Sequence, residues 1–148
     1  MGERYTSDPI ELPKAGPGAV SRADLVFYGV DHSSSSFTAR IFLDRPDADA
    51  TTPIDDPSYA GSFTIFGHGG CFGGPGHCDV KERDEPFDLR PPHQLTPATR
   101  TVMVTNHVKR MLGEASSDSF TVTVVAVVPG DESNDVLTLR HVRLLSYV

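Results

Sequence analysis

Six short segments rich in β-branched and aromatic residues, separated by Gly, Pro and Ser, constrain the fold of this chain most strongly. Residues 36–44 alternate apolar and polar side chains from Phe37 to Leu43, and residues 120–128 (FTVTVVAVV) are almost continuously apolar or β-branched. Such patterns predict strands with at least one buried face. The other expected strands are residues 24–30, 59–67, 99–104 and 136–148.

One helix is expected near residues 105–113, where apolar residues recur at helical spacing and Gly113 follows as a left-handed cap. A polar turn is expected to join the first two strands, and Pro129-Gly130-Asp131 to form a turn between the last two. The pattern predicts an all-β fold, an antiparallel β-sandwich or jelly-roll-like barrel with one short helix.

The length of 148 residues suits one domain. Residues 1–22 contain Pro and Gly between scattered polar residues and are expected to form an extended lead-in or linker before a single domain at 23–148. Residues 68–97 are rich in Gly and Pro and show no strong periodicity. So long a loop excursion within a compact domain is usually functional or disordered.

Composition and hydropathy argue against nucleic acid and membrane as partners. The net charge of −7 and pI near 5.2 argue against nucleic-acid binding, because phosphate contacts need clustered Lys and Arg. No apolar run approaches the roughly 20 residues of a membrane span, and residues 1–22 lack the apolar core of a signal peptide. We therefore expect a soluble protein that is cytoplasmic by default.

Residues 68–78 (HGGCFGGPGHC) hold the densest set of soft donor atoms in the chain. Three interpretations stay open. In the first, Cys71 and Cys78 form a disulfide or stay unpaired, and the two histidines face solvent. In the second, His68, Cys71, His77 and Cys78 bind copper or zinc, which prefer thiolate and imidazole ligands. The spacing C-x6-C is wider than in most zinc sites. In the third, Phe72 inserts into a partner's apolar cleft.

The segment YAGSF at 59–63, the apolar stretch ending in His68, the segment 106–114 and the strand beginning DSFTVTV at 118–124 carry a family resemblance. Residues 24–148 resemble the C-terminal β-sandwich domain of type 3 copper proteins, namely tyrosinases, plant polyphenol oxidases and molluscan haemocyanins. The resemblance implies a sandwich beside or over the entrance of a dicopper centre, which it shields in latent forms. In some members, cysteines in this region are tied to copper delivery.

The dicopper centre itself is not expected in this chain. It needs two sets of three histidines held on a helical bundle. The chain has six histidines, and only His107 falls on the expected helix. The sandwich therefore stands without its catalytic partner and is not expected to be a phenol oxidase by itself.

Other candidate sites are weaker. The acidic residues between 44 and 56 could hold Ca²⁺, but they lack the ordered spacing of a calcium loop. His32 precedes four serines, where a turn between strands is the plain interpretation. His107 and His141 are expected at the surface, and His93 in an exposed loop.

Three functions remain open. The first is a non-enzymatic accessory domain that docks on a tyrosinase-like dicopper partner to shield, stabilise or help load its site. The second is a metallochaperone or copper- or zinc-binding protein that uses residues 68–78. The third is an enzyme with unrelated chemistry on a β-sandwich scaffold, which would need a deep pocket of convergent polar groups.

Overall fold

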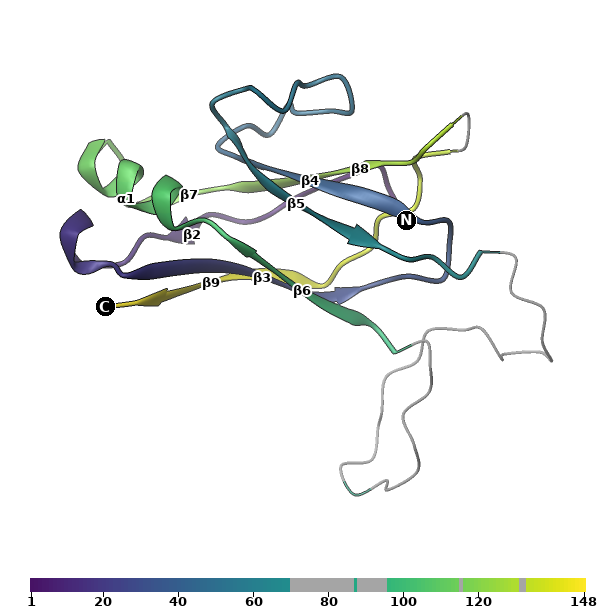
Figure 1. Cartoon of the computed structure of the whole chain (residues 1–148), viewed down its shortest axis with the longest axis horizontal. Coiled ribbons are helices and arrows are strands. Elements are labelled where there is room, and N and C mark those ends of the chain that lie inside the picture. The colour runs from purple at the N-terminus through teal and green to yellow at the C-terminus, as the bar shows by residue number, and fades with distance from the viewer. Residues whose placement is uncertain (70–86, 88–95, 115, 131–132) are drawn as a thin grey trace.

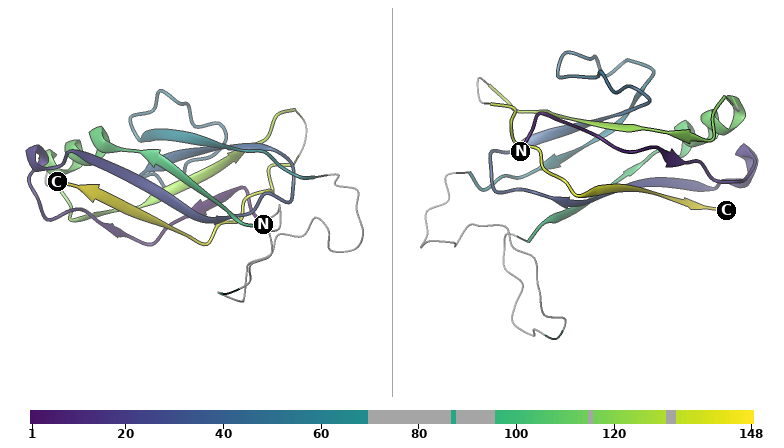
Figure 2. Two further views of the ribbon diagram at one scale, coloured as in Figure 1. Left: turned by 60° about the horizontal axis from the view of Figure 1, so that its bottom comes forward. Right: turned by 180° about the vertical axis from the view of Figure 1, so that it is seen from behind.

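Two layers of antiparallel sheet form the body of the protein, shown in Figure 1 and from two further sides in Figure 2. The computed structural model describes residues 1–69, 87, 96–114, 116–130 and 133–148. One layer is a four-stranded sheet of order β1-β8-β4-β5, and the other is a three-stranded sheet of order β6-β3-β9. A small sheet, β2-β7, lies at one end. The predicted all-β class and antiparallel sandwich are confirmed.

The strand boundaries follow the sequence pattern closely. In chain order the elements are β1 (Arg4–Thr6), β2 (Ile10–Glu11), a 3-10 turn (Pro17–Ala19), β3 (Arg22–Val30), β4 (Phe37–Leu43), β5 (Tyr59–Ile65), β6 (Ala98–Met103), α1 (Thr105–Glu114), β7 (Ser119–Phe120), β8 (Val122–Val127) and β9 (His141–Tyr147). The expected strand at 136–148 begins only at residue 141. The excursion expected at 68–97 lies mostly outside the described residues.

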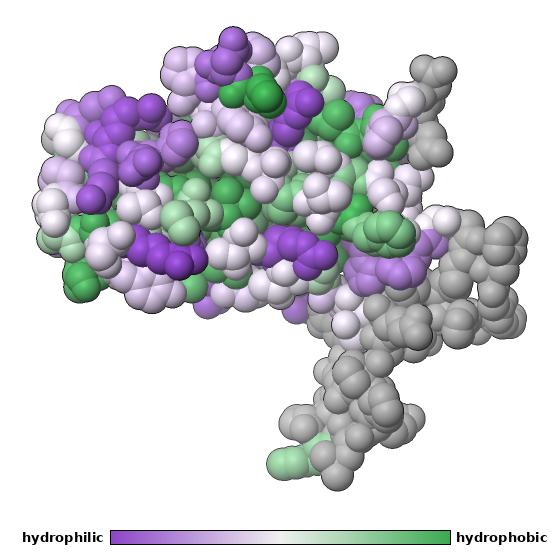
Figure 3. Space-filling model, viewed as in Figure 1, coloured by the Kyte–Doolittle hydropathy of each residue, from purple (hydrophilic) through white to green (hydrophobic). Residues whose placement is uncertain are grey.

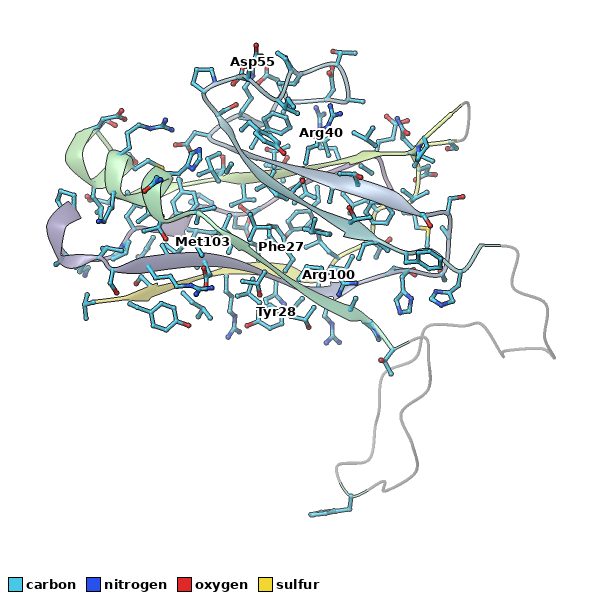
Figure 4. All side chains as sticks on the ribbon, viewed as in Figure 1. Phe27, Tyr28, Arg40, Asp55, Arg100 and Met103 are labelled. Atoms are coloured by element: carbon cyan, nitrogen blue, oxygen red, sulfur yellow. The ribbon has the colours of Figure 1, made fainter. Side chains whose placement is uncertain are left out.

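The core lies between the two layers. The alternating residues of β4 from Phe37 to Leu43 face inward and are at most 5% exposed, as their period of two predicts. The rings of Phe27 on β3 and Phe63 on β5 meet across the layers with centroids 5.0 Å apart. In Figure 4, Phe27 lies between the sheets while Tyr28 points away from them. This contact joins the layers at their centre.

Three connections cross between the layers at one end of the sandwich. The predicted turn between the first two strands does not form a hairpin, because β3 and β4 belong to different sheets. The last two strands, β8 and β9, likewise belong to different sheets, so the expected Pro-Gly turn is part of a longer crossing. Each of these strands has an apolar inner face. Two sheets that face each other bury the inner faces of both, whereas a single hairpin would leave its apolar face exposed.

Residues 1–22 differ from the expected lead-in. β1 pairs with β8 from Arg4 opposite Val125 to Thr6 opposite Thr123, and β2 pairs with β7. Tyr5, Ile10 and Leu12 pack against the core, and this apolar contact fixes the segment to the sheets. These residues therefore contribute an edge strand to the sandwich.

The expected helix is present as α1 at the end opposite the three crossings. Val108 is its buried residue, and the surface over the helix is largely hydrophilic in Figure 3. The predicted glycine cap is wrong: the helix continues through Gly113 to Glu114, and Gly113 is not among the glycines with positive φ. The structure shows no helix among the described residues that is long and apolar enough to cross a membrane.

The acidic loop at 44–58 covers the outer face of the four-stranded sheet. Ala48 and Tyr59 pack there against Phe42 and Val125. Two of the loop's carboxylates are engaged within the loop: Asp56 forms an ion pair with Arg45 and accepts a hydrogen bond from the Ser58 hydroxyl, and Asp49 accepts bonds from Thr51. These bonds hold the two turns of the loop in place.

Acid should loosen this loop. The hydroxyl and backbone N–H of Ser58, with Arg45, lower the pKa of Asp56 below its usual 3.8. A lowered folded-state pKa contributes stability above the unfolded value and loses it as pH falls through the folded value. Asp56→Asn should therefore lower the urea midpoint at pH 7, with the difference shrinking below about pH 4. Asp55→Asn, at an exposed position in the same loop, is the control and should leave the midpoint unchanged at both pH values.

Removing the central aromatic contact should destabilise the whole sandwich. Phe27 is fully buried, and Phe27→Ala should lower the free energy of unfolding by about 3–5 kcal/mol in urea titrations. Phe66, which is 81% exposed, is the control, and Phe66→Ala should change it by less than about 0.5 kcal/mol. Equal losses in the two variants would contradict this view of the core.

Candidate functional site

The structure describes one of the four predicted metal ligands, His68. Cys71, His77 and Cys78, and also Phe72, lie outside the described residues. The metal, disulfide and partner-insertion interpretations of these residues therefore stay predictions. His93 also lies outside the described residues.

His68 meets a second histidine that sequence reasoning assigned to a turn. The Nδ1 atoms of His32 and His68 are 3.0 Å apart, and the rings meet edge to face with centroids 4.9 Å apart. His32 is only 9% exposed. It follows β3, and His68 follows β5, so the pair joins the ends of the two layers.

The hydrogen bonds of the pair assign its tautomers. His32 Nε2 is 2.7 Å from the carbonyl oxygen of Thr96, and a carbonyl only accepts, so Nε2 carries the proton. In neutral His32 the Nδ1 atom then has a free lone pair. His68 Nδ1 lies 3.0 Å from this atom and 3.3 Å from the His32 carbonyl oxygen, so Nδ1–H of His68 donates to both. His32 is thus fixed at both ring nitrogens.

The backbone around the pair is clamped by three hydrogen bonds. His68 N–H donates to the carbonyl of His32 at 2.9 Å, Gly69 N–H to the carbonyl of Ser34 at 2.8 Å, and Gly67 N–H to the hydroxyl of Ser36 at 2.9 Å. A Cβ at Gly67 would stand only 2.1 Å from the Ser34 carbonyl oxygen. Glycine at this position therefore permits the close approach that brings the rings together.

The surface beside the pair is open and carries an exposed aromatic ring. Phe66 lies two residues before His68, and its side chain is 81% exposed. A hollow nearby is lined by Ser35, Ser36, Gly67, Gly69 and Pro129. Backbone and hydroxyl groups dominate this lining, so it suits polar contacts better than a buried apolar ligand.

The other described histidines have partners of their own. His107 on α1 is hydrogen-bonded through Nε2 to the carbonyl of Tyr59 at 2.9 Å, and His141 stacks on Tyr28 with centroids 4.7 Å apart. Both are half-buried, which places them less fully at the surface than expected. Among the described residues, no group of three or more His, Cys, Asp or Glu side chains gathers as a metal site.

The His32–His68 contact could not be read from spacing. The two residues are separated by 36 positions, and they meet because two crossing segments run side by side. The glycines around His68 were a usable signal, since clustered glycine marks a close backbone approach. The sequence does not indicate which segment of the chain packs against these glycines.

Comparison with solved structures identifies the architecture. Recombinant latent aurone synthase, a polyphenol oxidase, matches with a TM-score of 0.57 and 14% identity, over 98% of this chain and 24% of that chain. Latent apple tyrosinase matches with a TM-score of 0.59 and 14% identity, over 100% of this chain and 27% of that chain. This chain has the fold of one part of latent polyphenol oxidases. The resemblance to the C-terminal sandwich of type 3 copper proteins is thereby confirmed as a likeness of fold.

The chain spans about a quarter of the length of these enzymes. Latent aurone synthase from its natural source gives a similar match, with a TM-score of 0.56 and 16% identity. No protein-family model matches the chain, and no curated protein matches it significantly. The similarity to these enzymes is therefore one of backbone fold.

Filling the space at Gly67 should disturb the histidine pair. Gly67→Ala places a methyl group against the backbone of Ser34–Ser36 and should lower the free energy of unfolding by more than about 1 kcal/mol, because the backbone has to shift. The ring signals of His32 and His68 should move in NMR spectra. Gly113→Ala, where nothing lies within 4 Å, is the control and should be neutral or stabilising. Unshifted ring signals in Gly67→Ala would contradict the close approach.

Proposed function

We propose that this chain is a non-enzymatic accessory domain that docks on a dicopper oxidase-like domain and shields, stabilises or helps to load its copper site. The proposal is carried by one observation, the match of nearly the whole chain to about a quarter of two latent enzymes. In the family that the sequence resembles, such a sandwich lies beside or over the dicopper entrance. The remaining three quarters of such an enzyme would then correspond to the partner.

The histidines of this chain support a role without phenol oxidation. Coupled copper ions that bind dioxygen need six imidazoles on facing helices. The chain has six histidines in all, of which His107 lies on α1 with its Nε2 bound to a backbone carbonyl. His32 and His68 follow strands. The oxidase chemistry would therefore come from the partner.

The end of the sandwich that carries the histidine pair is our candidate for the docking face. Phe66 projects there with 81% of its surface exposed, and large aromatic side chains that insert into a partner's cleft often dominate binding energy. Ile54, 60% exposed, belongs to the acidic loop, which covers the outer face of the four-stranded sheet. Substitution of each residue thus tests whether its surface contributes to docking, because both are exposed apolar side chains on different surfaces.

The test uses a dicopper protein from the same organism, recognised by its two sets of three histidines and purified with copper. The mixture should elute as a complex in size-exclusion chromatography, and the initial rate of catechol oxidation should fall on addition of this chain. Phe66→Ser should weaken the complex about tenfold or more, and Ile54→Ser should leave it unchanged. A dicopper protein that elutes apart from the chain and keeps its rate would contradict the proposal.

A further inference from the structure

We propose that His32 and His68 bind one Zn²⁺ or Cu²⁺ ion through their two Nδ1 atoms. His32 was not among the ligands that the sequence suggested, and the site does not require a docking partner. Imidazole nitrogen is a preferred ligand of both ions. The inference rests on the separation of the two nitrogens, on the partner of the far nitrogen of His32, and on the clamped backbone.

The separation fits two ligands of one ion. Imidazole nitrogens bind zinc at about 2.0–2.1 Å, so two of them stand roughly 2.8–3.4 Å apart when the angle at the metal lies between a right angle and the tetrahedral value. The Nδ1 atoms of His32 and His68 are 3.0 Å apart. A linear two-coordinate Cu(I) site would need a wider separation, so the geometry favours the divalent ions.

The far nitrogen of His32 already has the partner of a metal ligand. Ligating histidines usually donate their other N–H to a carboxylate, a backbone carbonyl or water, which fixes the ring and leaves the lone pair facing the ion. His32 Nε2 makes this bond to the carbonyl of Thr96 at 2.7 Å. The bond persists unchanged whether Nδ1 accepts from His68 or binds a metal.

Binding would replace the bifurcated hydrogen bond that His68 Nδ1–H donates. In the metal-free pair, His68 Nδ1–H donates to His32 Nδ1 and to the His32 carbonyl. On binding, the proton leaves Nδ1 of His68 and the ring takes its proton on Nε2, so the two neutral rings release no net proton. Because backbone bonds from His68 and Gly69 already hold the segment, the ligands lose little further freedom. Two further positions of a tetrahedral ion stay open to water or to other donors.

The experiment titrates the chelator-treated full chain with Zn²⁺ by calorimetry and with Cu²⁺ by electron paramagnetic resonance. Wild type should bind one ion, with hyperfine coupling to imidazole nitrogens. His32→Gln and His68→Gln should each weaken binding about tenfold or more. His141→Gln, which removes a half-buried histidine on β9, should bind as wild type does. Equal affinity in His32→Gln and wild type would overturn the proposal.

Two further measurements distinguish binding at the histidine pair from binding at Cys71 and Cys78. In wild type labelled with ¹⁵N, Zn²⁺ should shift the Nδ1 signals of both His32 and His68, a readout that needs no variant to fold. A Zn²⁺-saturated chain in which neither signal moves overturns the proposal. In a Cys71→Ser, Cys78→Ser background, His32→Gln should still weaken binding. If that background has already abolished binding, the pair is no site of its own and the proposal fails.

Discussion

Burial of two inward faces against each other is the constraint on which the rest of the structure depends. Strands β3 and β4 follow one another in the chain, yet each carries an apolar face that has to be covered by a separate layer. The chain therefore crosses between layers after β3, after β5 and after β8 at one end, and it crosses back through α1 between β6 and β8 at the other end. The contact of Phe27 with Phe63 is one of many across the core that hold the layers together.

These crossings create the histidine pair. The segment after β3 and the segment after β5 run side by side because both strands end at the same end of the sandwich, and backbone hydrogen bonds join them. Gly67 allows an approach that any side chain would prevent. A buried imidazole bonded at both nitrogens is thus a product of packing and backbone geometry, and it lies where the Gly-rich segment departs from the sandwich.

The accessory role and the metal site are two proposals for the same end of the molecule, and they rest on different observations. Docking draws on the fold likeness to latent polyphenol oxidases and on the exposed ring of Phe66. Metal binding draws on two nitrogens 3.0 Å apart. Each can fail without the other, because an apolar contact at Phe66 needs no ion and the histidine pair needs no partner.

The sequence by itself determined the strands, the helix and the antiparallel class, because alternation of apolar side chains is a local property of each segment. It also drew attention to His68 and to the glycines beside it. It missed the pairing of residues 4–11 into the sheets, since this pairing depends on neighbours far away in the chain. It also assigned Gly113 to a cap, although the helix continues to Glu114. Only the tertiary structure decided that two polar turns were layer crossings and that His32 meets His68, because that contact exists only once the two faces are buried together.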